Sequence, residues 1–213
     1  MRVRILFSKS GWQAFTSTLD LQKIWERVMR RARLNLQYSQ GFHPQPRIQI
    51  ANPLPVGFIG LNEMVDVWFA DNLPIDVILE KVNPQLPEGL SIHGLEPIPE
   101  NALSLPGQVL FSEYSAGFFE KTSSFKALTS KVEQLLAEKS VIRERNHKTY
   151  DLRPLIHDMK MAETPEKSIE LLMRLSTNST QTGRPEEVLA VLGYQLGDYF
   201  VKRVNLILAE RAS

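Results

Sequence analysis

The sequence predicts an α+β protein of two tandem units, each with an antiparallel sheet. In the first half, the patterns of strands and helices follow one another in the order β-α-β-β-α-β, which is the split unit of ferredoxin-like domains. The second half can be divided in the same order, and 213 residues are enough for two small hydrophobic cores. A single α+β domain is the alternative, because only the order of elements relates the two halves.

Residues 1–100 are expected to form the first unit. VRILFS and EMVDVWFA alternate apolar with other side chains, as strands do when one face is buried. From Thr18 to Arg33 the apolar residues recur on one arc of a helical wheel, and Pro74 suits the first turn of a second helix. The strands are expected at 3–8, 47–57, 63–70 and 90–98, and the helices at 18–33 and 74–86.

Residues 101–213 are expected to form the second unit, which meets the first in the stretch PIPENALSLPG. SSFKALTSKVEQLLAEKS is strongly amphipathic, and Pro185 fits the first position of another helix. The strands are expected at 108–118, 141–149, 168–176 and 201–210, and the helices at 123–140 and 184–193.

Composition limits the class of protein and its chemistry. The chain is 43% hydrophobic and 23% charged and has no apolar run of membrane-spanning length. It has no cysteine and does not begin like a secretory signal, so we expect a cytoplasmic protein with no membrane partner. Without thiolates the chain cannot hold an iron–sulfur cluster by itself. The four histidines (His43, His93, His147 and His157) lack metal-ligand spacing, and we therefore expect no metal site and no cofactor.

Charge is segregated along the chain, although the net charge is only +1. Residues 1–60 hold nine Lys and Arg against two acids, whereas residues 61–113 hold one Lys against nine acids. On the helix at 18–33, the arc opposite the apolar one carries Lys23, Arg27, Arg30 and Arg31. Such a row of cations could follow a phosphate backbone, and a solvated surface face is the alternative.

The loop YSQGFHPQPR follows this helix. Gly41 allows backbone conformations closed to other residues, and Pro44 and Pro46 stiffen the rest of the loop, so it can present polar groups with little loss of entropy on binding. Its candidate nucleic-acid-binding residues are Tyr38, Phe42, His43 and Arg47. The aromatic rings could stack on exposed bases. The alternative is a packed turn in which His43 only satisfies a backbone group.

The second half offers weaker candidates. If RERNHK formed one strand, Arg143, Arg145 and His147 would share a face that could extend an RNA-binding surface. STNSTQTGRP could present backbone amides to an anion at the start of the next helix, with a flexible connection as the alternative.

Several strings resemble a radical-SAM-linked family of uncharacterised bacterial proteins, found alone or fused C-terminal to a radical SAM domain. The strings are LDLQKIWERVMRRARLNLQYSQGFHPQPRIQIANPLPVG, YDLRPLI, which contains Arg153, and GRPEEVLAVLG. The likeness covers about residues 2–208 and is most specific in the first string. Many relatives appear with His where this chain has Thr18. The resemblance implies a radical SAM enzyme as partner, and it implies no particular reaction.

We therefore expect a non-catalytic accessory protein of a radical SAM enzyme that binds RNA or recognises the substrate. A metal-independent endoribonuclease is one alternative, with His43 as general acid or base. A pure protein-interaction module that touches no nucleic acid is another. The acidic stretch from Glu63 to Glu100 could face the partner protein or keep nucleic acid off that surface.

Overall fold

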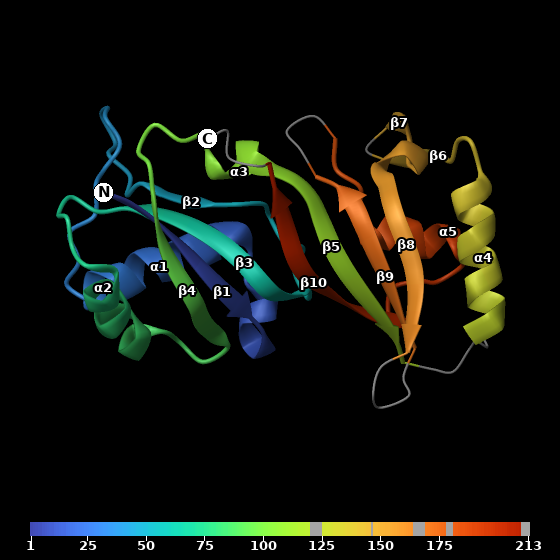
Figure 1. Ribbon diagram of the computed structural model, residues 1–213, viewed down its shortest axis with the longest axis horizontal. Helices are drawn as coiled ribbons and strands as arrows, with labels where there is room; N and C mark the ends of the chain where they lie inside the picture. Colours follow the sequence, from blue (N-terminus) through green and yellow to red (C-terminus); the bar gives the residue numbers. More distant parts are fainter. Residues whose placement is uncertain (120–124, 146, 164–168, 178–180, 210–213) are drawn as a thin grey trace. The chain divides into compact units, whose positions relative to one another are not determined.

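The computed structural model describes residues 1–119, 125–145, 147–163, 169–177 and 181–209. Over these ranges the protein is mixed α+β, with mostly antiparallel strands and few helices (Figure 1). The chain divides into two compact units, Met1–Val109 (unit 1) and Leu110–Ser213 (unit 2). The division follows Val109, whereas the sequence pattern places it after residue 100.

Unit 1 contains a sheet of strands in the order β4-β1-β3, and β2 also pairs with β3. Every one of these pairings is antiparallel. Its elements are β1 (Arg2–Lys9), α1 (Thr18–Arg31), β2 (Ile48–Ile50), β3 (Ile59–Trp68), α2 (Ile75–Val82), β4 (Leu90–Ile98) and α3 (Leu105–Gln108), with short 3-10 turns at Gly11–Phe15 and Asn83–Gln85. The strand at 47–57 is shorter than predicted, because only three of its residues pair in the sheet.

One face of the unit 1 sheet packs against α1 and α2. β1 contributes Val3, Ile5 and Phe7 to this core, and all three are fully buried. The Phe7 ring meets Trp25 of α1 edge to face at 5.0 Å between centroids. The remaining buried helix residues in the cluster are Leu21, Val28, Met29, Ile78 and Val82. The alternation of β1 therefore sends one set of side chains into an apolar layer and leaves the other set on the opposite face.

The opposite face of this sheet holds a buried ionic cluster. Arg2 and Arg4 of β1 are only 2% and 1% exposed, and Asp66 of β3 lies between them. Asp66 Oδ2 accepts from Arg2 Nη2 at 2.6 Å, and Asp66 Oδ1 accepts from Arg4 Nε at 2.8 Å. We call these three residues the Arg2–Asp66–Arg4 cluster. Within the interior, the Asp66 carboxylate of β3 is thus paired with both guanidinium groups of β1.

The segment before β5 covers this cluster. Arg2 donates to the carbonyl oxygens of Ala102 and Leu103, at 2.8 and 2.9 Å. Arg4 donates to the Gln108 side-chain oxygen at 3.1 Å, and the Gln108 amide donates in turn to the Leu103 carbonyl at 2.6 Å. The two arginines thus fasten residues 102–108 over the second face of the sheet.

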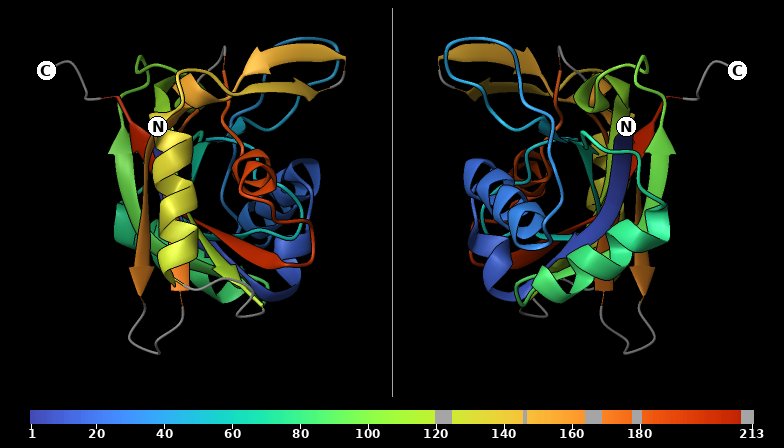
Figure 2. Two further views of the ribbon diagram at one scale, coloured as in Figure 1. Left: turned by 90° about the vertical axis from the view of Figure 1, so that its right-hand side faces the viewer. Right: turned by 90° about the vertical axis from the view of Figure 1, so that its left-hand side faces the viewer.

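Unit 2 has a main sheet in the strand order β10-β5-β9-β8 and a separate two-stranded ribbon, β6-β7 (Figure 1). Its elements are β5 (Val109–Phe118), α4 (Phe125–Ala137), β6 (Ile142–Arg145), β7 (Lys148–Asp151), β8 (Ile156–Glu163), β9 (Ile169–Ser176), α5 (Pro185–Val191) and β10 (Tyr199–Leu208), with a 3-10 turn at Arg153–Leu155. The α4 side chains Leu128, Val132 and Leu135 are buried. Figure 2 shows the ribbon as an arm that projects from the rest of unit 2.

The ribbon corrects the prediction of a single strand at 141–149. The chain turns after Arg145, and His147 has a left-handed φ of 61°. His147 therefore does not share a strand face with Arg143 and Arg145, and Lys148 of β7 lies opposite Arg145 instead. β9 pairs with β5 on one side and with β8 on the other, and the sequence pattern does not predict β8 because a register shift between Ile156 and Asp158 breaks its alternation.

We expect Asp66→Asn to lower the free energy of unfolding of unit 1 by about 3–5 kcal/mol, because removal of one partner leaves buried charge uncompensated. Denaturant unfolding followed by tryptophan fluorescence measures this, since Trp12, Trp25 and Trp68 all lie in unit 1. Glu26→Gln is the control: it breaks the exposed Arg30–Glu26 pair and should cost below about 1 kcal/mol. Equal losses for the two variants would contradict the role assigned to the buried cluster.

Candidate functional site

Helix α1 presents the predicted basic face to solvent. Its apolar residues Leu21, Trp25, Val28 and Met29 are buried. Lys23, Arg27, Arg30 and Arg31 are all on the solvent side, and Arg30 forms an ion pair with Glu26 at 2.5 Å. The other three have no ion-pair partner among the described residues. The helix therefore carries three cations whose charge no neighbouring carboxylate offsets.

The end of α1 adds a cation that the sequence pattern misses. Arg33 follows the C-cap and has a left-handed φ of 55°. The backbone N–H of Arg33 donates to the Arg30 carbonyl, and the N–H of Leu34 donates to the Met29 carbonyl, both at 3.1 Å. These two bonds are those of a Schellman motif, in which glycine is the usual left-handed residue. An arginine here is a strained choice, and it sets a charged side chain at the end of the helix.

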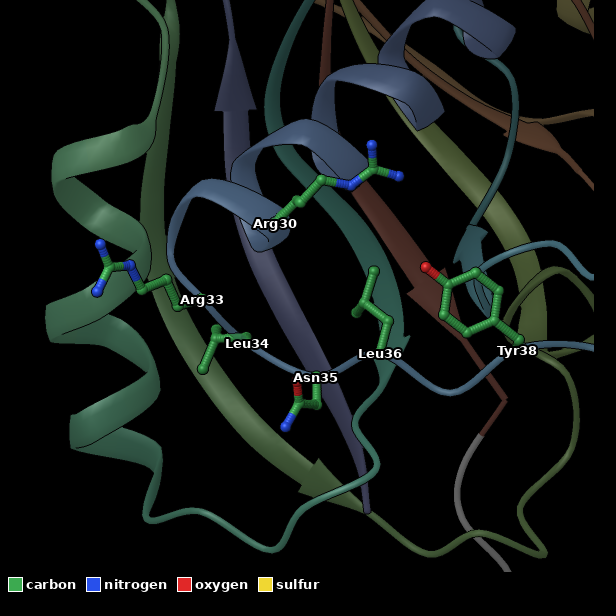
Figure 3. A pocket seen from close by; sticks show the side chains of 6 residues that line it. All are labelled: Arg30, Arg33, Leu34, Asn35, Leu36 and Tyr38. Atoms are coloured by element: carbon green, nitrogen blue, oxygen red, sulfur yellow. The ribbon is translucent and has the colours of Figure 1, made fainter.

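A hollow of about 310 Å³ lies at this end of the helix (Figure 3). Its lining residues are Arg30, Arg33, Leu34, Asn35, Leu36 and Tyr38. Figure 3 shows Arg30 and Tyr38 on one side of the hollow and Arg33 pointing away from them. The Asn35 amide donates to Asp71 at 2.8 Å, which fixes the chain between α1 and Tyr38. Two predicted binding residues, Arg30 and Tyr38, thus line the same hollow, and Arg33, which is not among the predicted binding residues, lines it from another side.

The predicted loop is a hairpin closed by backbone hydrogen bonds, and we call residues 37–47 the 37–47 hairpin. Ser39 N–H donates to the Gln45 carbonyl, and Arg47 N–H donates to the Gln37 carbonyl, both at 2.8 Å. Gly41 at the tip has a φ of 128°, a conformation that few residues other than glycine adopt. Phe42 beside it is 102% exposed, and Tyr38 on the flank is 48% exposed. The hairpin holds both aromatic rings in solvent on a stiff support.

His43 lies at the exposed tip of the hairpin. It makes no hydrogen bond and no ion pair with another described residue. A catalytic histidine is normally oriented by a neighbouring group, and the endoribonuclease alternative therefore stays a prediction without added support.

The base of the hairpin is stacked on a tryptophan. The guanidinium of Arg47 lies 4.6 Å from the centre of the Trp68 ring, and that of Arg2 lies 4.7 Å from it. Arg47 also donates to the Gln37 side chain at 2.8 Å. The indole N–H of Trp68 is buried and has no hydrogen-bond partner among the described residues. Both arginines and Trp68 line a second hollow of about 390 Å³. Arg47 is thus a positioning residue for the hairpin as well as a surface cation.

The charge segregation of the sequence is partly cancelled in the fold. Arg2 and Arg4 belong to the buried cluster and do not contribute to a surface patch. Asp66 pairs with both of them, and Glu96 approaches Arg4 at 3.8 Å. Glu100 pairs with the N-terminal amine at 3.2 Å. Three acids of the acidic stretch therefore pair with positive groups of unit 1 itself. The exposed lysines and arginines of the described part of unit 1 are those of α1 together with Arg33, Arg47 and Lys81.

Two other residues marked by the sequence have local roles. Arg153 donates to the Leu136 carbonyl at 2.8 Å and to the Ile156 carbonyl at 3.0 Å, so it ties the end of α4 to the start of β8. Thr18 is the first residue of α1, and the preceding Ser17 caps the helix by accepting from the N–H of Asp20. Thr18 therefore lies at the end of α1 opposite to the hollow with Tyr38.

The described ranges contain no group of three His, Asp or Glu side chains placed to hold a metal ion. Within the same ranges, no helix is long and apolar enough to cross a membrane.

The fold resembles that of a chain in a crystal structure of a Cbf5-Nop10-Gar1 complex, with a TM-score of 0.53 at 7% sequence identity. The match covers 96% of the present chain and 48% of that chain, so this protein spans about half the length of the structure it resembles. At this identity the likeness concerns the fold alone. Curated protein sequences show no match.

A family model described as "uncharacterized protein conserved in bacteria" (DUF2344) matches residues 2–185. The chain therefore belongs to this family.

We expect Arg33→Gly to raise the free energy of unfolding of unit 1 by up to about 1 kcal/mol, because glycine adopts the left-handed conformation without strain. Arg33→Ala removes the same side chain but keeps the strain, so it should bring no gain. Tryptophan fluorescence during denaturation compares the two variants. If alanine stabilised as much as glycine, backbone strain at Arg33 would not be the cause.

Proposed function

We propose that this member of a family of uncharacterized bacterial proteins binds single-stranded RNA through unit 1, as a non-catalytic accessory of a radical SAM enzyme. The observation that carries the proposal is the continuity of one surface within unit 1. The exposed cations of α1 lead to the hollow at Arg30 and Tyr38, and the 37–47 hairpin continues from Tyr38 to Phe42.

The chemistry of this surface suits an unpaired strand. Cations along a helix can neutralise successive phosphates, and arginine can bind a phosphate oxygen pair with two N–H groups. Exposed aromatic rings offer faces on which unpaired bases stack. Duplex RNA hides its base faces, so a fully exposed Phe42 would have no base to meet there. The combination therefore favours single-stranded over double-stranded RNA.

The strongest competing explanation is electrostatic support of the helix itself. Arg30 and Arg31 lie in the last turn of α1, where positive charge interacts favourably with the helix dipole. Lys23 and Arg27 lie before that turn and gain little from this effect. The strained arginine at position 33 also costs stability, which a role confined to helix support does not account for.

The role as an accessory of a radical SAM enzyme rests on the resemblance of the sequence strings. The chain has no cysteine, so a partner would have to supply the iron–sulfur cluster. Purification of the tagged full chain from its native cells, with identification of bound protein and bound RNA, tests this part separately. Recovery of RNA without a radical SAM enzyme would remove the accessory role and keep the RNA-binding one.

We further propose that both units are ferredoxin-like repeats. In support, unit 1 has the order β4-β1-β3 with β2 on β3, and the unit 2 sheet has the order β10-β5-β9-β8. If the β6-β7 ribbon is set aside, both units run β-α-β-β-α-β along the chain and place their first strand between their fourth and third.

We expect neutralisation of Arg27, Arg30 and Arg31 to glutamine to weaken binding of a fluorescein-labelled single-stranded RNA. A plot of log K against log salt concentration should become less steep, with its slope smaller in magnitude by about 2. This corresponds to about 0.7 for each phosphate that is no longer neutralised. Fluorescence anisotropy at several salt concentrations measures both quantities. Lys126, Lys160 and Lys81 are exposed cations of other elements, and their triple change to glutamine is the charge-matched control. If the control reduced the slope as much, binding would follow net charge and not the α1 surface.

We expect Phe42→Ser to reduce RNA affinity by about 1–3 kcal/mol without changing the salt slope, since stacking on a base involves no counterion release. The control is Trp12→Ser, which removes another exposed aromatic ring of unit 1, 84% exposed in the 3-10 turn after β1. Unaltered affinity in Phe42→Ser would exclude the hairpin from the RNA interface.

The variant His43→Ala tests the endoribonuclease alternative in an assay of RNA cleavage. That alternative requires His43→Ala to lose cleavage and to retain binding.

A further inference from the structure

Unit 2 contains a basic hollow that lies outside the surface proposed above. It has a volume of about 550 Å³ and lies between the β6-β7 ribbon and the segment that leads into α5. Its polar lining residues include Arg145, Lys148, Tyr150, Asp151, Thr182 and Arg184. Pro154 and Leu155 add an apolar part. Volumes of this order are typical of sites for small organic ligands.

The pairing of the ribbon explains why its cations gather on one side. Arg143 lies opposite Tyr150, and Arg145 lies opposite Lys148. Because side chains alternate along a strand, all four project from the same face of the ribbon. Arg143 Nε donates to Glu187 of α5 at 3.0 Å, which fastens that face toward the start of α5. Arg145 and Lys148 are thereby directed to the side on which Arg184 lies.

Most of the positive charge in the hollow is not offset by ion pairs. Arg145 and Lys148 form none with any described residue, whereas Arg184 forms an ion pair with Glu186 at 3.7 Å. Glu187 is engaged by Arg143. The one carboxylate in the described lining, Asp151, accepts through Oδ1 from the backbone N–H groups of Val141 and Arg153, at 2.8 and 3.0 Å.

The charge state of two lining groups follows from their surroundings. The Val141 N–H, with smaller help from Ser140 and Arg153, lowers the pKa of Asp151, so this group stays a carboxylate held by the backbone. Burial, reinforced by Glu187, raises the pKa of the Tyr150 phenol, against the opposite effect of Arg143, Arg145 and Arg184. Tyr150 is therefore protonated at neutral pH. Its hydroxyl has no hydrogen-bond partner among the described residues and can donate to a ligand.

We propose that this hollow binds a phosphate monoester, with Arg145, Lys148, Arg184 and the Tyr150 hydroxyl around the phosphate and the organic part over Pro154 and Leu155. Three cations around one anion suit a doubly charged phosphate better than a carboxylate or a neutral group. The phosphate of a free nucleotide and the terminal phosphate of an RNA strand share this chemistry. The site is independent of RNA binding by unit 1.

Isothermal titration of the full chain with uridine 5′-monophosphate and with uridine tests the proposal. The nucleotide should bind at least about tenfold more tightly than the nucleoside, because only it offers charged acceptors. The double variant Arg145→Gln, Lys148→Gln should lose about tenfold or more in affinity for the nucleotide. Tyr150→Phe keeps the ring and removes one donor, so it should lose about three- to tenfold.

The charge-matched control is Lys126→Gln, Lys160→Gln, since both lysines are exposed residues of unit 2 that do not line the hollow. Circular dichroism checks that every variant keeps its fold. Equal binding of nucleotide and nucleoside, no binding of the nucleotide, or an equal loss in the control would each overturn the proposal.

The source of the phosphate is tested with 5′-phosphorylated and 5′-hydroxyl hexauridylate. These probes are compared in a chain whose α1 face carries the Arg27, Arg30 and Arg31 neutralisations, so that unit 1 does not mask the result. Tighter binding of the phosphorylated strand than of the mononucleotide identifies an RNA end as the ligand. Equal binding of the two strands, with the mononucleotide still bound, identifies a free nucleotide.

Discussion

Unit 1 depends on how two arginines are accommodated in its interior. In β1, Val3, Ile5 and Phe7 face one side of the sheet and Arg2 and Arg4 face the other, and all five are buried. Asp66 makes this possible because it meets both guanidinium groups, and backbone carbonyls of residues 102–103 accept further N–H groups of Arg2. A buried ion pair gives little net stability compared with apolar packing, but its geometry is demanding. The cluster therefore fixes the register of β1 on β3 and the path of the segment after β4.

The same cluster is connected to the candidate RNA surface. Arg2 contacts Asp66 with its guanidinium edge and lies over one side of Trp68, while Arg47 lies over the same indole at a similar distance. Arg47 is also hydrogen bonded to the other side of the hairpin base through Gln37. The hairpin that exposes Phe42 thus rests, through Arg47, on the ring of Trp68. Arg2 of the buried cluster contacts the same ring and helps to set its position. A binding loop supported in this way loses little conformational entropy when it binds.

Local patterns predict the elements well where burial follows a simple period. The strand at 90–98 and the start of the helix at Thr18 coincide with the observed elements. The helix stops earlier than its apolar pattern because Arg33 leaves the helical conformation. β8 is missed since its bulge moves the buried Met159 out of the expected alternation. The ribbon is mistaken for one strand because the sequence between β6 and β7 carries no Gly or Pro.

The candidate site was less predictable than the fold. The sequence shows how many cations precede residue 60 but not that Arg2 and Arg4 meet a carboxylate more than sixty residues away. It places Trp68 in a strand without showing that two arginines stack on it. Arg33 could be found only by knowing that a left-handed residue ends α1, where glycine would be the ordinary choice. In unit 2, the grouping of Arg145 with Lys148 and Arg184 depends on a hairpin pairing and on the position of α5, and neither has a local sequence signal.

The β6-β7 ribbon enters and leaves unit 2 at adjacent points. The N–H of Leu152 donates to the carbonyl of Val141 at 2.8 Å, so the two ends of the ribbon lie side by side. A segment with neighbouring ends can be shortened, lengthened or replaced while the sheet beneath it keeps its connections. The length and sequence of this arm, and with them the lining of the unit 2 hollow, can therefore change without altering any strand of the main sheet.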